Sequence, residues 1–236
     1  MEHSVELELG GKKLRVETGR VARQANGAVL LHIGETVILA TATMSKAARE
    51  GCDFFPLTCD YEERKYAVGK IPGGFVKRGG RPSERAILTS RLIDRPVRPL
   101  FPDGMRNDVQ VIAMPVSVDL EVVPDVMAVT AAAFALAVSD IPFQGPMAAV
   151  RVTRVEGELI VNPSYEQTQA GDIDLVAEGL PPDSSAAVLL YENLWAVKTM
   201  AALVDAGAFL LMQERIPHDV VVEALADIAE LSAQSA

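Results

Sequence analysis

The strongest structural signals in this 236-residue sequence come from residues 53–101, DFFPLTCDYEERKYAVGKIPGGFVKRGGRPSERAILTSRLIDRPVRPLF. Ser83 follows a proline and precedes an acid, which is typical of a helix N-cap. We expect the helix to begin there and to run until Pro96 stops it. Two Gly-Gly pairs precede the helix, so residues 71–82 are predicted to form an exposed, mobile loop.

The same region carries most of the positive charge of an acidic protein, whose formal net charge is -10. Residues 64–98 contain ten Lys or Arg and two acids, a net charge of +8, whereas residues 178–236 contain two bases and nine acids, a net charge of -7. A general basic surface is therefore excluded. A focused basic patch remains, and such a patch suffices for a defined polyanion channel.

Two interpretations of this basic patch fit the composition equally well. In the first, Phe75 stacks on a base while Lys77, Arg78 and Arg81 hold phosphates, as expected for single strands bound without sequence preference. In the second, the patch is a solvated loop and a helix whose arginines pair with acids of the same fold.

The overall composition indicates an ordinary globular protein, because 49% of the residues are hydrophobic and 23% are charged. No run of about 18 apolar residues and no secretory signal is present, so we expect a soluble, cytoplasmic protein without membrane contact. Cys52 and Cys59 are too few for a disulfide framework and are expected to be free thiols.

Alternation and turn residues predict a mixed α and β chain. Residues 5–19 and 27–45 read as hairpins and, with a strand near residues 53–64, as an antiparallel meander. A strand at 107–119 precedes a buried helix from residue 124, with Asp125 as a plausible cap. Further on we expect a hairpin around Glu156-Gly157 and then a turn and a strand over residues 166–179. The remaining residues read as a β-α-β-α tail, with segments at 181–194, 195–207, 208–216 and 217–234.

Two acids near the end of this region could bind a metal ion. Asp172 and Asp174 are two residues apart, which predicts that they lie on one side of a strand. No third ligand is evident, so a structural role for both is the simpler interpretation.

Residues 53–104 and the segments NDVQVIAMPVSVD, IPFQGPMAAVRV and LIVNPSYEQ closely resemble the first core domain of bacterial polynucleotide phosphorylase. The resemblance covers about residues 6–176. It implies an α+β, RNase PH-like (ribosomal protein S5 domain 2-like) sheet with packed helices over residues 1–177. Members of the family degrade single-stranded RNA from its 3′ end, using inorganic phosphate and Mg²⁺ and releasing nucleoside diphosphates, and their subunits form trimeric rings.

The resemblance also assigns roles to individual residues. It places Phe75, Val76, Lys77 and Arg78 in the loop that constricts the ring's pore and grips RNA. Two arginines are usual in this loop, so Lys77 keeps the charge but loses the planar fork. Basic positions that line the RNA path or bind anions correspond to Arg81, Arg91, Arg95 and Arg98.

The resemblance argues against phosphorolysis by this chain alone. Catalysis in the family belongs to a second core domain, which we do not find in this sequence. The nearest equivalent of its metal-binding motif is GDIDLVAEG: Asp174 occupies the second acidic position, Val176 replaces a lysine and Thr168 replaces the earlier acid. We therefore expect a degenerate site at Asp172 and Asp174 that holds Mg²⁺ poorly, no catalytic residue in this chain, and a separate chain as a candidate source of the catalytic core.

Residues 178–236 are expected to depart from the family and weakly resemble a short, uncharacterised bacterial family. Within them, AAVLLYE is expected to pair back on DIDLVAEG. Two other classes of function stay open: a non-catalytic structural or assembly subunit, and a chimeric or truncated reading frame without its own activity. A stand-alone RNase PH-type exonuclease is disfavoured by the degenerate acidic site.

Overall fold

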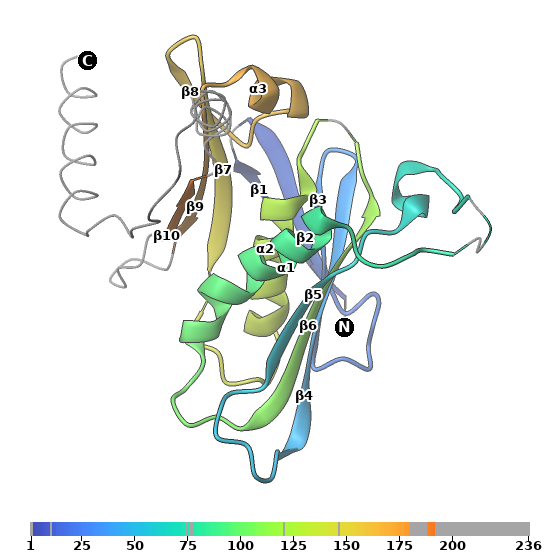
Figure 1. The fold of residues 1–236 in the computed structure, drawn as a ribbon, viewed down its shortest axis with the longest axis vertical. Coiled ribbons are helices and arrows are strands. Elements are labelled where there is room, and N and C mark those ends of the chain that lie inside the picture. The colour runs from blue at the N-terminus through green and yellow to red at the C-terminus, as the bar shows by residue number, and fades with distance from the viewer. Residues whose placement is uncertain are drawn as a thin grey trace, which may run out of the picture. The chain divides into compact units, whose positions relative to one another are not determined.

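Two β-sheets and the helices between them form the part of the chain that the computed structural model describes, residues 2–9, 11–73, 75, 78–119, 121–145, 147–179 and 188–191. The chain divides into two compact units, residues 1–194 and 195–236, and every described residue belongs to the first. The larger sheet has the strand order β1-β2-β3-β4-β6-β5, and the smaller has the order β10-β9-β7-β8 (Figure 1).

The strands of each sheet and the helices have the following bounds in the chain. The strands of the larger sheet are β1 (His3–Leu9), β2 (Lys12–Thr18), β3 (Gly27–Ile33), β4 (Thr36–Ala48), β5 (Leu57–Tyr61) and β6 (Asn107–Ser117). Those of the smaller sheet are β7 (Ala148–Val155), β8 (Glu158–Val161), β9 (Ile173–Gly179) and β10 (Val188–Tyr191). The helices are η1 (Lys65–Val68), α1 (Glu84–Val97), η2 (Arg98–Leu100), α2 (Pro124–Ala137) and α3 (Tyr165–Ala170).

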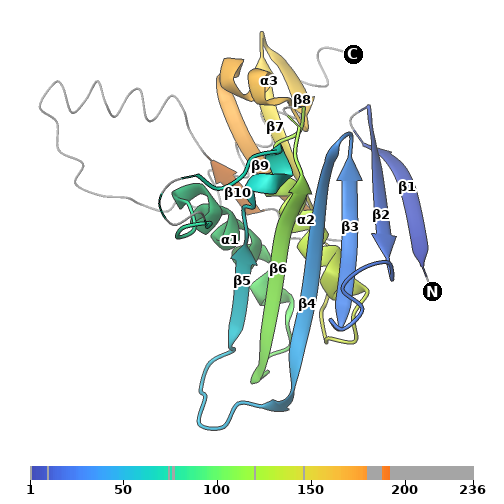
Figure 2. The same ribbon diagram turned by 90° about the vertical axis from the view of Figure 1, so that its right-hand side faces the viewer.

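The first four strands form the predicted antiparallel meander. Gly11 and Gly34 adopt φ of 72° and 58° in its two-residue turns, a backbone conformation that glycine tolerates best. The prediction was wrong for β5, which pairs in parallel with β6 at the edge of the sheet (Figure 2). Parallel neighbours need a long crossover, and the segment that contains α1 supplies it.

Helix α1 begins as predicted, because the Ser83 hydroxyl accepts a hydrogen bond from the Ala86 amide at 3.0 Å. Its end differs, since Pro96 lies inside the helix, which runs to Val97 and continues into η2. Pro96 and Val97 are buried, so burial in the core outweighs the one backbone hydrogen bond that a proline cannot donate.

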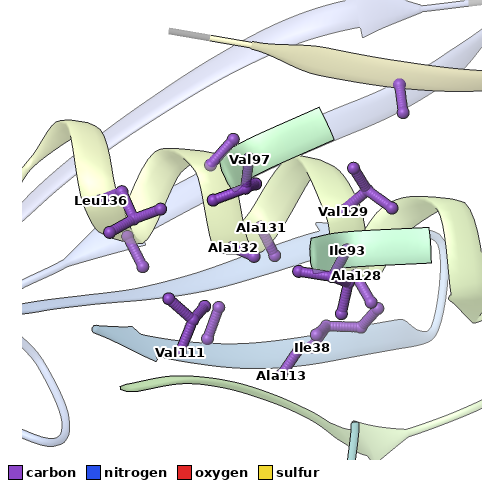
Figure 3. Packing of buried hydrophobic residues seen from close by; sticks show 14 of the residues in the cluster. Ile38, Ile93, Val97, Val111, Ala113, Ala128, Val129, Ala131, Ala132 and Leu136 are labelled. Atoms are coloured by element: carbon purple, nitrogen blue, oxygen red, sulfur yellow. The ribbon is translucent and has the colours of Figure 1, made fainter. Parts of the chain in front are cut away.

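Helix α2 is buried on nearly all sides, and its alanines let the neighbouring elements approach closely. Figure 3 shows Ala128, Ala131 and Leu136 beside side chains from the strands and from α1. The helix begins at Pro124 with Val123 as N-cap, so the expected cap, Asp125, lies in the first turn instead. Within the described residues no helix has the length and hydropathy that a membrane span requires.

The smaller sheet contains the predicted hairpin, with Glu156 and Gly157 both at positive φ between β7 and β8. Residues 165–170 form the short helix α3 instead of the expected turn, because Ser164 and Gln167 build a reciprocal capping box. The predicted pairing of AAVLLYE on DIDLVAEG is confirmed by the antiparallel ladder of β10 on β9. The expected domain boundary after residue 177 falls inside β9, and the other expected tail elements lie outside the described residues.

The start of β3 lies close against the end of α2. A Cβ placed on Gly27 would lie 2.0 Å from the Ala135 carbonyl oxygen and 2.8 Å from the Ser139 Cβ. We expect Gly27→Ala to reduce the free energy of unfolding by about 1–3 kcal/mol, because the helix and strand must separate. Chemical denaturation measures the change. Gly73→Ala, with nothing within 4 Å of its Cβ, is the matched control, and equal stability of the two variants would contradict this account.

Candidate nucleic-acid interface

The segment between β5 and α1, described at residues 62–73, 75 and 78–83, projects from the larger sheet as an arm (Figure 1). Three of its described glycines have open space around them: a Cβ at Gly73, Gly79 or Gly80 would meet nothing within 4 Å. The arm therefore has the exposure predicted for the glycine-rich loop.

Four residues of the arm are predicted to bind RNA, and the structure describes three of them, Phe75, Arg78 and Arg81. Phe75 is fully exposed, and Arg78 and Arg81 are exposed as well. Neither arginine makes an ion pair with any residue in the described ranges. Lys77 and Val76 lie outside those ranges. An exposed ring with unengaged guanidinium groups near it in the chain can stack on a base and bind phosphates.

Helix α1 adds further cations. Arg91 and Arg95, four residues apart, are exposed on the helix as their spacing predicts, and within the described part of the chain neither has an ion-pair partner. Arg85 points elsewhere, with a nitrogen 3.7 Å from an Asp125 carboxylate oxygen. Ile87 and Leu88 lie between Arg85 and Arg91 in the sequence and are exposed, so the outer face of α1 is partly apolar.

Arg98 differs from the other predicted anion-binding residues. Its guanidinium makes a two-point contact with Asp94, at 2.6 and 3.0 Å, and donates to the backbone carbonyls of Phe55 and Leu57. These contacts fasten the end of α1 to the start of β5. They favour a structural role over the expected contact with a bound anion.

The two acids of the predicted pair, Asp172 and Asp174, each contact a different arginine of β7. Arg151 binds the Asp174 carboxylate at 2.7 and 3.1 Å and also contacts Asp125 at 3.1 Å. All three side chains are almost fully buried. The sequence analysis missed Arg151. The available signal was an arginine in register with the buried residues Ala149 and Thr153 on alternate positions of a strand.

Asp172 has a different partner, Arg154, whose guanidinium contacts it at 2.7 to 3.2 Å. Hydrogen bonding from Arg154 lowers the pKa of the Asp172 carboxyl below its ordinary value. Arg151 and Arg154 are three apart on β7, so they face opposite sides of the sheet. The expectation that the two acids lie on one side of a strand was therefore wrong. Asp172 precedes β9, and the two acids pair with arginines on opposite sides of the smaller sheet.

These ion pairs bear directly on metal binding. Both carboxylates of the GDIDLV segment are neutralised by a guanidinium, and a divalent cation would have to displace it. Among the described residues no three His, Cys, Asp or Glu side chains gather as metal ligands. The acidic residues that the structure describes here do not fit a catalytic Mg²⁺.

Residues 10–142 match the 3′ exoribonuclease family, domain 1, and residues 145–182 match domain 2 of the same family. The first match covers more than half of the chain. The chain therefore belongs to the 3′ exoribonuclease family.

Its curated relatives include the polyribonucleotide nucleotidyltransferases of Heliobacterium modesticaldum, 51% identical over 93% of this chain, and of Finegoldia magna, 59% identical over 74%. The chain spans 28% and 24% of the length of these two proteins. An alignment over 93% of the chain extends beyond residue 182, so it includes part of the segment 178–236 that we expected to depart from the family.

Solved structures share the fold. Rice (Oryza sativa) Rrp46 aligns with a TM-score of 0.60 and 13% identity, over 87% of each chain. The Archaeoglobus fulgidus exosome with RNA bound to its active site aligns with a TM-score of 0.56 and 18% identity, over 87% of this chain and 83% of that one. The predicted RNase PH-like fold is confirmed.

The buried contact of Arg151 with Asp174 is expected to stabilise the fold far more than the exposed contact of Arg154 with Asp172. Asp174→Ala should reduce the free energy of unfolding by about 3 kcal/mol, because it leaves a buried guanidinium short of one carboxylate. Asp172→Ala, the matched control, should have a much smaller effect because water screens the exposed pair. Denaturant melts of both variants measure the difference, and equal losses would contradict it.

Proposed function

We propose that this chain is the RNA-holding first core of a polynucleotide-phosphorylase-type 3′ exoribonuclease, and that it binds single-stranded RNA without degrading it by itself. The carrying observation is the arm, on which exposed Phe75 is followed by Arg78 and Arg81, both exposed and without an ion pair among the residues that the structure describes. Relatives at about 50% identity that are named polyribonucleotide nucleotidyltransferase support the same assignment.

The arm binds RNA through two kinds of contact. The Phe75 ring stacks on a base, and every base offers a π face, so this contact tolerates any sequence. Lys77, Arg78 and Arg81 bind backbone phosphates, and Arg91 and Arg95 extend the cationic surface along α1. None of these contacts reads a base edge, which matches binding without sequence preference.

Phosphorolysis by the family uses inorganic phosphate and Mg²⁺, and we propose that this chain binds neither productively. The acids at its degenerate site are held by Arg151 and Arg154. We further propose a cytoplasmic location, a trimeric ring of this chain, and a second core that supplies the catalytic residues from another part of the protein or from a separate chain. Residues 1–177 form the first core in this proposal, and residues 178–236 form an atypical segment attached to it.

A second candidate function is that of a non-catalytic assembly subunit. The exposed apolar residues Ile87 and Leu88 on α1 favour it, because apolar side chains beside cations are common at protein interfaces. Oligomeric state and RNA binding distinguish the two candidates. A trimer that binds RNA supports the first, and a monomer indifferent to RNA supports the second.

Substitutions in the arm should weaken RNA binding in a salt-dependent way. Lys77→Ala and Arg78→Ala are each expected to lower the affinity for poly(A) and to reduce the slope of log K against log salt by about 0.7. Fluorescence anisotropy over a salt series measures both quantities. Arg49→Ala removes an exposed arginine that is paired with Asp108 outside the arm and serves as the charge-matched control. An unchanged affinity and slope in the arm variants would exclude this role for the arm.

We expect the purified chain, incubated with poly(A), inorganic phosphate and Mg²⁺, to release no measurable nucleoside diphosphate. The reason is that Asp172 and Asp174 are already paired with arginines. Chromatography of the released nucleotides provides the measurement, with a full-length relative as the positive control. Robust release by this chain would overturn the assignment of catalysis to another core.

A further inference from the structure

The base of the arm presents a second aromatic ring that the sequence analysis did not select. Tyr66 is 56% exposed on η1, nine residues before Phe75. Nine residues of extended chain span at most about 30 Å, so the two rings lie within one short stretch of an extended single strand. The arm therefore offers two exposed π faces.

Tyr66 is held more firmly than a loop residue. Its hydroxyl donates to the Met114 Sδ on β6 at 3.5 Å. The next residue, Ala67, is buried, and its carbonyl accepts a hydrogen bond from the Val118 amide at 2.9 Å. Gly69, at φ 67°, ends η1 with hydrogen bonds back to Lys65 and Tyr66. The ring thus projects from an element fastened to the larger sheet, and little entropy is lost when a base stacks on it.

Cations flank this ring. Lys65 and Lys70 are exposed, and neither makes an ion pair within the described part of the chain. Arg64 is engaged by Glu62 and does not contribute in the same way. Val68 and Ile71 are exposed too and add apolar surface. An aromatic ring between two ammonium groups that have no ion pair in the described ranges has the chemistry of a single-stranded nucleic-acid contact.

We propose that Tyr66 is a second base-stacking platform, at the fixed base of the arm, for the single-stranded RNA that Phe75 contacts farther out. Lys65 and Lys70 bind the phosphates on either side of the stacked nucleotide. The proposal rests on the proposed function, because it extends the same RNA path from the arm toward the larger sheet.

The test compares three variants of the full chain, Tyr66→Ala, Phe75→Ala and Phe54→Ala, with a fluorescein-labelled single-stranded oligoadenylate as the probe. Phe54 is 62% exposed in the connection between β4 and β5, outside the arm, and is the matched aromatic control. We expect Tyr66→Ala to weaken binding about fivefold or more, since loss of one stacked base costs about 1–3 kcal/mol. We expect the slope of log K against log salt to stay unchanged, because no phosphate contact is lost.

Conservative substitution separates stacking from a structural role. Tyr66→Phe keeps the ring and loses the hydroxyl, so it should restore most of the affinity that Tyr66→Ala loses, and thermal unfolding of both variants verifies the fold. Weakened binding in Phe75→Ala but not in Tyr66→Ala would overturn this inference and leave the proposed function standing. No loss in either variant, with no loss in the arm cation variants, would overturn both. A change of oligomeric state in Tyr66→Ala without a change in RNA affinity would assign the ring to a protein interface and overturn the inference.

Discussion

Burial of α2 between the larger sheet, β7 and α1 is the constraint on which the described fold depends. Eleven of its fourteen residues are buried, and five of these are alanine, whose small side chains let the neighbouring strands and helices pack close to the helix backbone. The close contact of Gly27 with the end of α2 is part of the same arrangement. A helix buried on this scale carries its polar residues into the interior, where they need partners.

Asp125 is such a residue, in the first turn of α2, and its burial explains the acidic site of the smaller sheet. Arg151 reaches it from β7 and also binds Asp174 of β9, while Arg85 approaches it from α1. Burial raises the pKa of the nearby Tyr61 hydroxyl, and the negative charges of Asp125 and Glu63 raise it further, whereas Arg85 lowers it. The Arg151 guanidinium thus joins β7 and β9 of the smaller sheet to α2, and it occupies the Asp174 carboxylate that a metal ion would need.

The basic residues divide into two groups that the sequence alone does not separate. Arg85 and Arg98 contact acids of the same fold, as the structural interpretation of the basic patch requires, and so does Arg151 outside the patch. Arg78, Arg81, Arg91 and Arg95 are exposed and, among the described residues, without ion pairs. The structural interpretation of the patch is therefore confirmed for Arg85 and Arg98, whereas RNA binding by the second group stays a prediction, and the proposed RNA path uses only that group.

The sequence by itself determined the local features: the Ser83 cap, the Gly34 and Gly157 turns, the exposed glycine-rich arm and the pairing of β10 on β9. Each depends on a few neighbouring residues or on alternation along one strand, and such signals survive in any tertiary context. The tertiary structure decided the parallel place of β5, the burial of Pro96 in α1, and the ion pairs of Asp172 and Asp174. These depend on residues far apart in the chain, because a carboxylate can bind a metal ion or an arginine, and only the folded positions of Arg151 and Arg154 select between the two.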